Sequence, residues 1–230
     1  MIFHFCFFHG EWRDIYTLCL QSCLTRAKPE KIIVHYDKAG VGPAWEAAQS
    51  LEIEWRQVTP VDSELYGLEK VLESGGFCSS LDFVFLKNFE PLRHNEAVIG
   101  TQCRQKKKLF TGLIGCQAGS AFVQNYLEDY KISNAKEKKM IAWRLSMEHP
   151  VTIYPRSTFL PVAWTNKSFW TGSVPKLRNS FAIHLWEAQH PELSLEMLAK
   201  TGIAAEIQKL QHPIDIVTVV SVRSGFLTFD

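Results

Sequence analysis

Residues 74–86 read SGGFCSSLDFVFL, and this stretch decides the architecture that we expect. Apolar side chains spaced as in a helix over residues 65–72 stop at Gly75 and Gly76. Glycine suits a helix C-cap because it enters the left-handed region without a Cβ penalty. Asp82 follows a serine-rich step, and an unbroken apolar run then predicts a buried strand over 83–86. A carboxylate at the rim of an α/β sheet stands where such folds bind ligands; the alternative is that Asp82 merely caps a turn.

The first part of the chain has a strand–helix–strand pattern. Apolar residues 2–8 predict a first strand that ends in a turn at His9 and Gly10, residues 14–24 predict a helix, and residues 31–36 predict a second strand. This order predicts parallel pairing with a right-handed crossover, so the turn after the first strand opens onto the ligand crevice.

Alternation of apolar and charged residues over 51–56 predicts a further strand with one solvated face. Asn134 and Glu137 have the spacing of a helix-capping pair. We find no internal repeat and no long linker, so we expect one α/β domain over residues 1–230, with a mostly parallel central sheet flanked by helices.

Composition limits the classes of function and compartment. A chain of 230 residues that is 46% hydrophobic can bury a full core. The formal net charge of +1 gives no reason to expect a nucleic-acid partner. Six cysteines without a C-x-x-C pair favour free thiols and a reducing compartment. We see no secretory signal and no apolar run of ~20 residues, so we expect a cytoplasmic protein without a transmembrane segment.

The stretch from Gly75 to the strand at 83–86 resembles the DXD-containing, sugar-binding region of a glycosyltransferase family. That family includes α-1,6-mannosyltransferases, α-1,4-galactosyltransferases and bacterial polysaccharide enzymes. Its pattern is a helix with Asp and Arg, then Gly-Gly-Ile-Tyr-Leu-Asp-x-Asp and an apolar strand. Asp82 falls on the second Asp of the motif and Ser80 on the first. Glu64 falls on the helix Asp and Gly67 on the Arg.

Other segments are similar to the same family in the same order. Residues 2–10 resemble its opening strand and turn, 31–36 its second strand, and 111–116 the segment after the DXD strand. Residues 181–187 (FAIHLWE) closely resemble its late His-Leu-Trp motif. The resemblance implies a GT-A-type enzyme that moves a sugar from a UDP- or GDP-linked donor to a glycan or lipid-linked acceptor, with retention of anomeric configuration.

The resemblance also implies roles for particular residues. Asp82 would be the chief protein ligand of Mn²⁺ or Mg²⁺, and His184 a second ligand or a donor to phosphate. Glu64 would hold hydroxyl groups of the donor sugar or of the ribose. The residues expected at the donor site are Phe8, His9, Gly10, Glu64, Ser80, Asp82, His184 and Trp186. From the residues alone, His9 could be a solvated turn histidine and His184 a satisfied core histidine.

Two departures from the family pattern leave the activity open. The hydroxyl of Ser80 cannot supply the charge of the missing Asp, and Gly67 removes a bidentate partner for a carboxylate or phosphate. The protein could work with one Asp, use another donor geometry, or bind nucleotide or glycan without turnover. A nucleotidyltransferase is a further alternative, but residues 9–12 lack the Gly-rich, basic signature that this class needs after its first strand.

Two features bear on the acceptor. The basic run 104–108 (RQKKK) is either a solvated loop tip or a loop beside an anionic acceptor, such as a phosphorylated lipid, which would allow peripheral contact with a membrane. Trp164 and Trp170 are either walls on which a sugar stacks or ordinary core aromatics.

Overall fold

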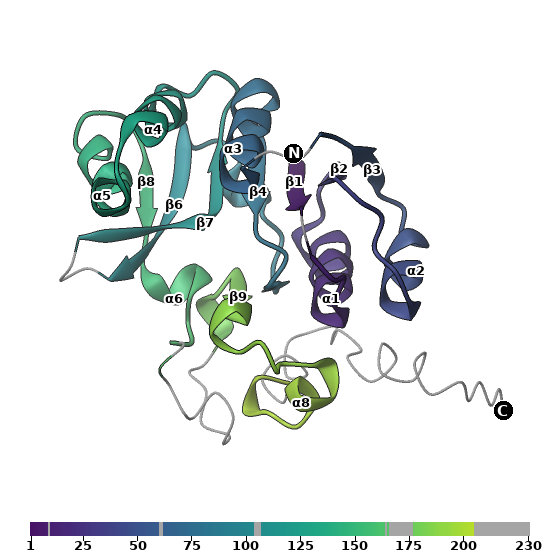
Figure 1. Cartoon of the computed structure of the whole chain (residues 1–230). Coiled ribbons are helices and arrows are strands. Elements are labelled where there is room, and N and C mark those ends of the chain that lie inside the picture. The colour runs from purple at the N-terminus through teal and green to yellow at the C-terminus, as the bar shows by residue number, and fades with distance from the viewer. Residues whose placement is uncertain (9, 60–61, 104–106, 164, 166–176, 205–230) are drawn as a thin grey trace, which may run out of the picture.

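The computed structural model describes residues 1–8, 10–59, 62–103, 107–163, 165 and 177–204. Within them a seven-stranded sheet has the order β3-β2-β1-β4-β7-β6-β8 (Figure 1), and a two-stranded sheet pairs β5 with β9. The strands are β1 (Ile2–Phe7), β2 (Lys31–Tyr36), β3 (Glu54–Gln57), β4 (Gly76–Ser79), β5 (Phe83–Phe85), β6 (Ala97–Cys103), β7 (Lys108–Cys116), β8 (Thr152–Tyr154) and β9 (Ala182–His184).

The large sheet is mostly parallel, as the sequence predicts. Strand β1 pairs in parallel with β2 and β4, β2 with β3, and β6 with β8. Strand β7 runs antiparallel to both β4 and β6. It does so because the chain returns directly from β6 into β7, and a short return of this kind joins antiparallel strands. The basic run 104–108 spans the chain between β6 and β7 and the first residue of β7; of this run, only Lys107 and Lys108 are described.

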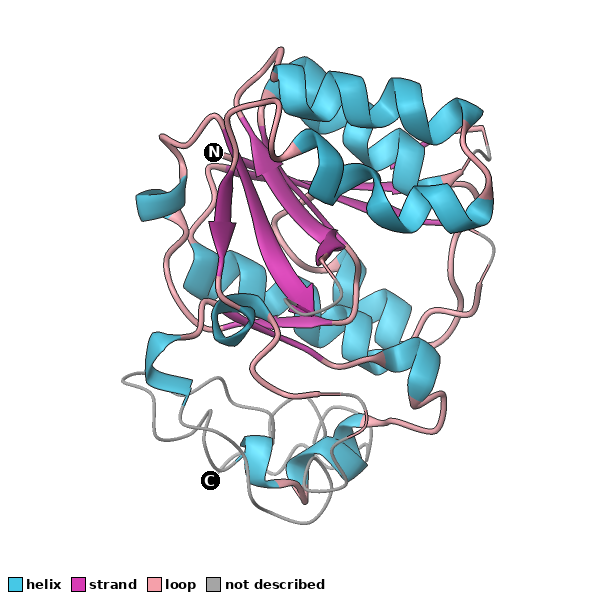
Figure 2. Ribbon diagram, turned by 90° about the vertical axis from the view of Figure 1, so that its left-hand side faces the viewer, coloured by secondary structure: helices cyan, strands magenta, loops and turns pink. Residues whose placement is uncertain are grey.

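Helices cover both faces of the large sheet (Figure 2). On one face α3, α4 and α5 enclose a core with Ile99 and Ile114 of the sheet; on the other, residues of α1 and α2 pack with Phe3, Phe5 and Phe77. The longer helices are α1 (Asp14–Ser22), α2 (Pro43–Gln49), α3 (Ser63–Ser74), α4 (Ala121–Ile132) and α5 (Ala135–Leu145). Shorter helical segments are α6 (Arg156–Phe159), α8 (Leu195–Ala199), the π-helical turn Cys23–Ala27, and the 3₁₀ turns Glu90–Leu92, Leu177–Asn179 and Glu187–Gln189.

Local signals in the sequence set several helix ends. Asp62 caps α3 by accepting from the backbone N–H groups of Glu64 and Leu65. Gly75 ends α3 with φ of 69°, as expected for a glycine C-cap. Asn134 and Glu137 exchange reciprocal hydrogen bonds at the start of α5, which confirms the expected capping pair.

The apolar run 83–86 is buried, as predicted, but its strand lies outside the large sheet. The chain leaves that sheet at Ser79, and β5 pairs antiparallel with β9 instead, with Phe83 opposite His184. All three residues of β5 are buried because this small sheet packs against α1. The sequence could not place this strand, since burial of a short apolar run does not say which partner it pairs with.

The six cysteines form no disulfide, as expected. Burial raises the pKa of the Cys6 and Cys116 thiols to about 12, and it also raises the pKa of Cys19, Cys23 and Cys78 well above its ordinary value. These groups are therefore neutral thiols at pH 7. Across the residues that the structure describes, no helix is both long and apolar enough to cross a bilayer.

Candidate functional site

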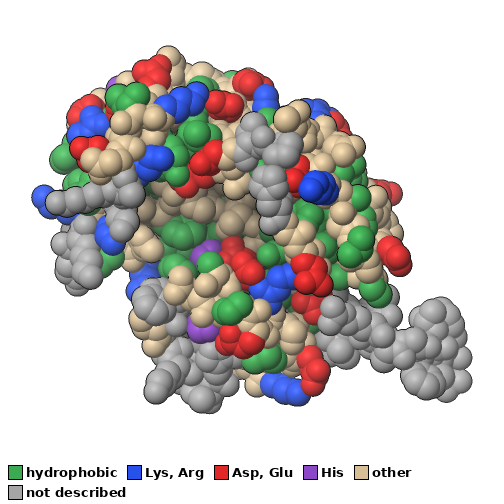
Figure 3. All heavy atoms as spheres, viewed as in Figure 1, with side chains coloured by type: hydrophobic (Ala, Val, Ile, Leu, Met, Phe, Trp, Pro, Cys, Tyr) green, Lys and Arg blue, Asp and Glu red, His purple; other side chains and the backbone are tan. Residues whose placement is uncertain are grey.

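A cavity of about 500 Å³ opens at the carboxyl ends of β1 and β4, the edge at which open α/β sheets bind ligands. Figure 3 shows it as a hollow, with acidic, basic and histidine side chains along its lower edge. Its lining includes all of the described residues expected at the donor site except Trp186. These are Phe8, Gly10, Glu64, Ser80, Asp82 and His184.

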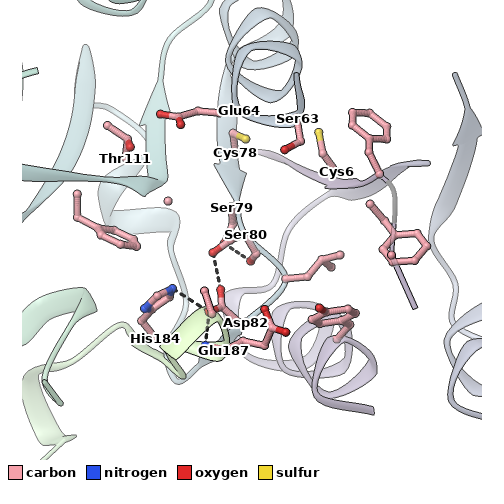
Figure 4. A pocket seen from close by; sticks show the side chains of 18 of the residues that line it. Cys6, Ser63, Glu64, Cys78, Ser79, Ser80, Asp82, Thr111, His184 and Glu187 are labelled. Atoms are coloured by element: carbon pink, nitrogen blue, oxygen red, sulfur yellow. Dashed lines mark hydrogen bonds and ion pairs between the residues drawn. The ribbon is translucent and has the colours of Figure 1, made fainter. Parts of the chain in front are cut away.

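Asp82 is the most heavily bonded group of the cavity (Figure 4). Its Oδ1 accepts from the Ser80 hydroxyl at 2.7 Å, and its Oδ2 accepts from the backbone N–H of Glu187 at 3.0 Å and lies 3.0 Å from His184 Nε2. Burial alone would raise the pKa of Asp82, but His184 and these donors outweigh it and the pKa is lowered. Asp82 is therefore ionised at neutral pH. It does not merely cap a local turn, because it bonds to residues more than 100 positions later in the chain.

The small sheet brings His184 to Asp82. Phe83 lies opposite His184 in the β5–β9 pair, and the N–H of Leu185 donates to the carbonyl of Asp82 at 2.7 Å. The imidazole contacts the rings of Phe83, Phe110 and Trp186, with centroids 4.8, 4.9 and 4.4 Å away. Its Nδ1 is buried without a hydrogen-bond partner among the described residues. The ring is thus fixed with Nε2 toward Asp82.

Other expected residues have different positions. Trp186 is buried behind His184, donates from Nε1 to the carbonyl of Val162 at 2.9 Å, and does not line the cavity. His9, Trp164 and Trp170 lie outside the described residues.

Glu64 projects from the first turn of α3 into the upper half of the cavity (Figure 4). Its Oε1 accepts from the hydroxyl of Tyr126 at 3.1 Å, and its Oε2 from that of Tyr130 at 3.3 Å. This role of the two tyrosines of α4 was not predicted from the sequence. Their spacing of four residues puts both hydroxyls on one helix face, but nothing in the sequence says that α3 lies opposite.

The contribution of Arg13 to the site was not predicted from the sequence either. It donates from Nη1 to Glu187 Oε1, and from Nη2 to the carbonyls of Pro191, at 2.7 Å, and Leu193. Glu187 lines the cavity and its N–H donates to Asp82, so Arg13 holds the segment that closes over the carboxylate. Burial, followed by the charge of Glu187, raises the pKa of the neighbouring Tyr16 to about 12.

The charge of the described cavity lining is acidic. Its described lining contains the carboxylates of Glu64, Asp82 and Glu187, and neither Lys nor Arg. Neighbouring ligands of an octahedral ion lie about 3.0 Å apart when metal–ligand bonds are about 2.1 Å. Asp82 Oδ2 and His184 Nε2, the two atoms that could hold such an ion, lie 3.0 Å apart and are in direct ion-pair or hydrogen-bond contact with each other. Among the described residues no group of three or more His, Cys, Asp and Glu could hold a metal ion, so water or substrate oxygens would have to complete its coordination.

Close packing explains why position 67 is a glycine. A Cβ at this position would lie 2.3 Å from the Sγ of Cys78 and 3.5 Å from that of Cys6. Helix α3 therefore lies directly on β1 and β4 at this point, and the structure has no room for the arginine of the family pattern.

The chain matches no protein-family model and no curated protein sequence. Among solved structures, it is similar to the galactosyltransferase LgtC in complex with donor and acceptor sugar analogs, with 12% identity, a TM-score of 0.51, and coverage of 100% of this chain and 98% of that one. The Q189E active-site mutant of LgtC gives 11% identity with the same TM-score and coverage. The PaToxG glycosyltransferase gives 13% identity and a TM-score of 0.48 over 64% of this chain and 67% of that one. The likeness to LgtC establishes the fold, the GT-A-type α/β arrangement expected from the sequence.

Proposed function

We propose that this protein is a glycosyltransferase that moves a sugar from a nucleoside diphosphate donor, UDP- or GDP-linked, to a glycan or lipid-linked acceptor. One observation carries the proposal. Asp82, just before β5, and His184, at the end of β9, meet in a cavity at the carboxyl ends of the parallel strands. The fold shared with a galactosyltransferase supports the same conclusion.

The charges of the cavity support a divalent cation as the cofactor. A bound diphosphate would face three carboxylates and no Lys or Arg of the described lining. Mn²⁺ or Mg²⁺ held by Asp82 and His184 would supply the positive charge that stabilises the leaving diphosphate. The ionised state of Asp82 favours such a ligand, because metal ions bind the deprotonated carboxylate.

The remaining residues position the donor. Phe8 and Gly10, on either side of His9, would form the wall that contacts the nucleotide base. Glu64 would accept hydrogen bonds from sugar or ribose hydroxyls. Ser80 orients Asp82 through its hydroxyl, and Trp186 acts only through its contact with the His184 ring.

In the proposed reaction, the bond between the anomeric carbon and the diphosphate oxygen breaks, and its electron pair leaves with the diphosphate. The acceptor hydroxyl oxygen forms the new bond to the anomeric carbon. Its proton passes to a diphosphate oxygen, so no protein base is needed, and attack from the leaving-group face retains the anomeric configuration.

Calorimetric titration of UDP and of GDP, each with and without Mn²⁺, tests the proposal. We expect Mn²⁺-dependent binding of one nucleotide, weakened at least about tenfold in Asp82→Asn, since the amide is isosteric but carries no charge. Asp129→Asn is the matched control, because that residue pairs with Arg144 on the surface of α4. Binding that ignores both Mn²⁺ and the Asp82 substitution would contradict the proposed site.

A relative that binds nucleotide or glycan without turnover is the second candidate. The observation that favours it is Ser80, which donates to Asp82 where the family pattern has a second carboxylate. Hydrolysis of, or transfer from, a bound nucleotide sugar separates the two. Turnover that disappears in Asp82→Asn would exclude the binding-only alternative.

The cytoplasmic location and the peripheral contact with a membrane remain predictions. Residues 104–106 of the basic run lie outside the described residues, and Lys107 and Lys108 alone do not define an acceptor surface.

A further inference from the structure

The upper half of the cavity is formed by α3, β4 and β7. Figure 4 shows Glu64 there, on the side of the cavity opposite Asp82 and His184, with Thr111 and Cys78 beside it. We call Glu64 and Thr111 the Glu64 subsite. It has a single charged group, and that group is a carboxylate.

Two tyrosines fix this carboxylate from behind. Tyr126, 2% exposed, and Tyr130 each donate to a different oxygen of Glu64, and their rings lie 5.8 Å apart. Burial and then the charge of Glu64 raise the pKa of both tyrosines, that of Tyr130 to about 12, so both remain donors at neutral pH. The carboxylate is thereby held in one orientation, with acceptor capacity left for groups in the cavity.

No described cation reaches into this subsite. Lys138 lies over the ring of Tyr130, with Nζ 3.9 Å from the centroid, and does not line the cavity. Arg13 lies at the other end and is engaged by Glu187 and two carbonyl groups. A negatively charged group placed beside Glu64 would thus meet a like charge, and no described residue would offer it a compensating positive charge.

We propose that the Glu64 subsite makes the protein select a neutral sugar with free hydroxyl groups over a uronic acid. This inference rests on the proposed function and names its donor class. A sugar hydroxyl donates to the carboxylate, whereas a second carboxylate is repelled in a partly dehydrated cavity. Tyr126 and Tyr130 are positioning residues, because they act on the sugar only through Glu64.

The test compares donors that differ at one carbon. Affinities for UDP-glucose and UDP-glucuronic acid, and for GDP-mannose and GDP-mannuronic acid, are measured in Mn²⁺ with UDP and GDP as references. For the nucleotide that binds, we expect the neutral sugar to bind at least about tenfold more tightly than its acid. In Glu64→Gln this ratio should fall to about threefold or less, since the amide keeps the size and removes the charge.

The positioning role has its own readout. In the double variant Tyr126→Phe with Tyr130→Phe, Glu64 keeps its charge but loses its fixed orientation. We expect the neutral sugar to lose affinity relative to the bare nucleotide by about fivefold or more, while the acid stays the weaker ligand. Glu69→Gln, on the same helix but paired with Lys131, and Tyr154→Phe, outside the cavity, are the controls. Thermal unfolding of each variant shows that it is folded.

The outcomes separate the two proposals. Binding of UDP or GDP together with equal affinity for a neutral sugar and its acid would overturn the inference and leave the proposed function standing. An unchanged ratio in Glu64→Gln would do the same. If neither nucleotide nor any sugar nucleotide binds, the proposed function fails and the inference falls with it.

Discussion

His184 Nε2 lies 3.0 Å from Oδ2 of Asp82; strand β5, which begins just after Asp82, pairs antiparallel with β9, which ends at His184. The site is therefore completed by one strand pairing, in which the late strand β9 lies alongside the strand that follows Asp82. The pairing also explains why a carboxylate that is only 8% exposed stays ionised, since its charge is met by an imidazole, a hydroxyl and a backbone N–H.

Ser80→Asp should restore the charge of the family motif. Without a divalent cation, we expect the variant to be less stable by about 1 kcal/mol, because the new carboxylate replaces a hydroxyl that donates to Asp82. With Mn²⁺ it should gain more stability than the native protein does. Thermal unfolding with and without Mn²⁺ measures both effects. Ser80→Ala, which loses only the hydrogen bond, is the control, and an equal response of all three proteins to Mn²⁺ would argue against a cation at Asp82.

Arg13→Lys should loosen the segment that covers Asp82. Lysine keeps the charge near Glu187 but cannot bond at the same time to Glu187 and to the carbonyl groups of Pro191 and Leu193. We expect a loss of about 1 to 3 kcal/mol in the free energy of unfolding and faster hydrogen exchange over residues 185–195.

The control for this change is Arg93→Lys. The Arg93 guanidinium also pairs with two carboxylates, those of Glu30 and Glu90, but its side chain is 46% exposed. The substitution should therefore lower the free energy of unfolding by less than about 1 kcal/mol. Equal effects of the two substitutions would show that Arg13 is an ordinary surface ion pair.

Gly67→Ala should be destabilising by about 2 to 3 kcal/mol, because its Cβ would lie 2.3 Å from the Sγ of Cys78. The double variant Gly67→Ala with Cys78→Ala removes the colliding sulfur. We expect the double variant to lose less free energy of unfolding than the two single variants together, by at least about 1 kcal/mol, as measured by urea unfolding. Additive effects would mean that the helix, and not the sulfur, moves to admit the methyl group.

Acid should destabilise the fold through two buried histidines under α3. His4 Nδ1 lies 3.1 Å from His35 Nε2, and His4 Nε2 lies 2.9 Å from the hydroxyl of Ser74. Burial lowers the pKa of both from 6.5 to about 4, helped for His4 by the charge of His35 and for His35 by that of Arg56. Between pH 6.5 and 4 the unfolded chain binds protons that the folded chain does not, so stability is lost as pH falls through this window and is unaffected above it.

Urea unfolding at pH 7, 6, 5 and 4.5 measures this slope. In His4→Gln the stability should depend less steeply on pH, because one of the two groups no longer takes up a proton on unfolding. His94→Gln, at an exposed position, should leave the slope as it is. A native slope that is flat between pH 6.5 and 4.5 would contradict the assignment of both histidines as neutral in the fold.

What the sequence determined is local. The glycine pair ended α3, Asp62 and the pair of Asn134 with Glu137 set helix starts, and the run 83–86 was recognised as a buried strand. These features depend on the backbone preferences and side-chain bonds of residues close in the chain. The strand–helix–strand order was also enough to predict that β1 and β2 pair in parallel, because a crossover of that kind has few alternatives.

What only the tertiary structure decided is which distant groups meet. The pairing of β5 with β9 brings His184 to Asp82, α4 supplies two hydroxyls to Glu64, and Arg13 reaches Glu187. Each contact joins segments whose separation in sequence carries no information about their separation in space. Their geometry follows from how the helices and the small sheet pack on the large one, and that packing is a property of the whole core.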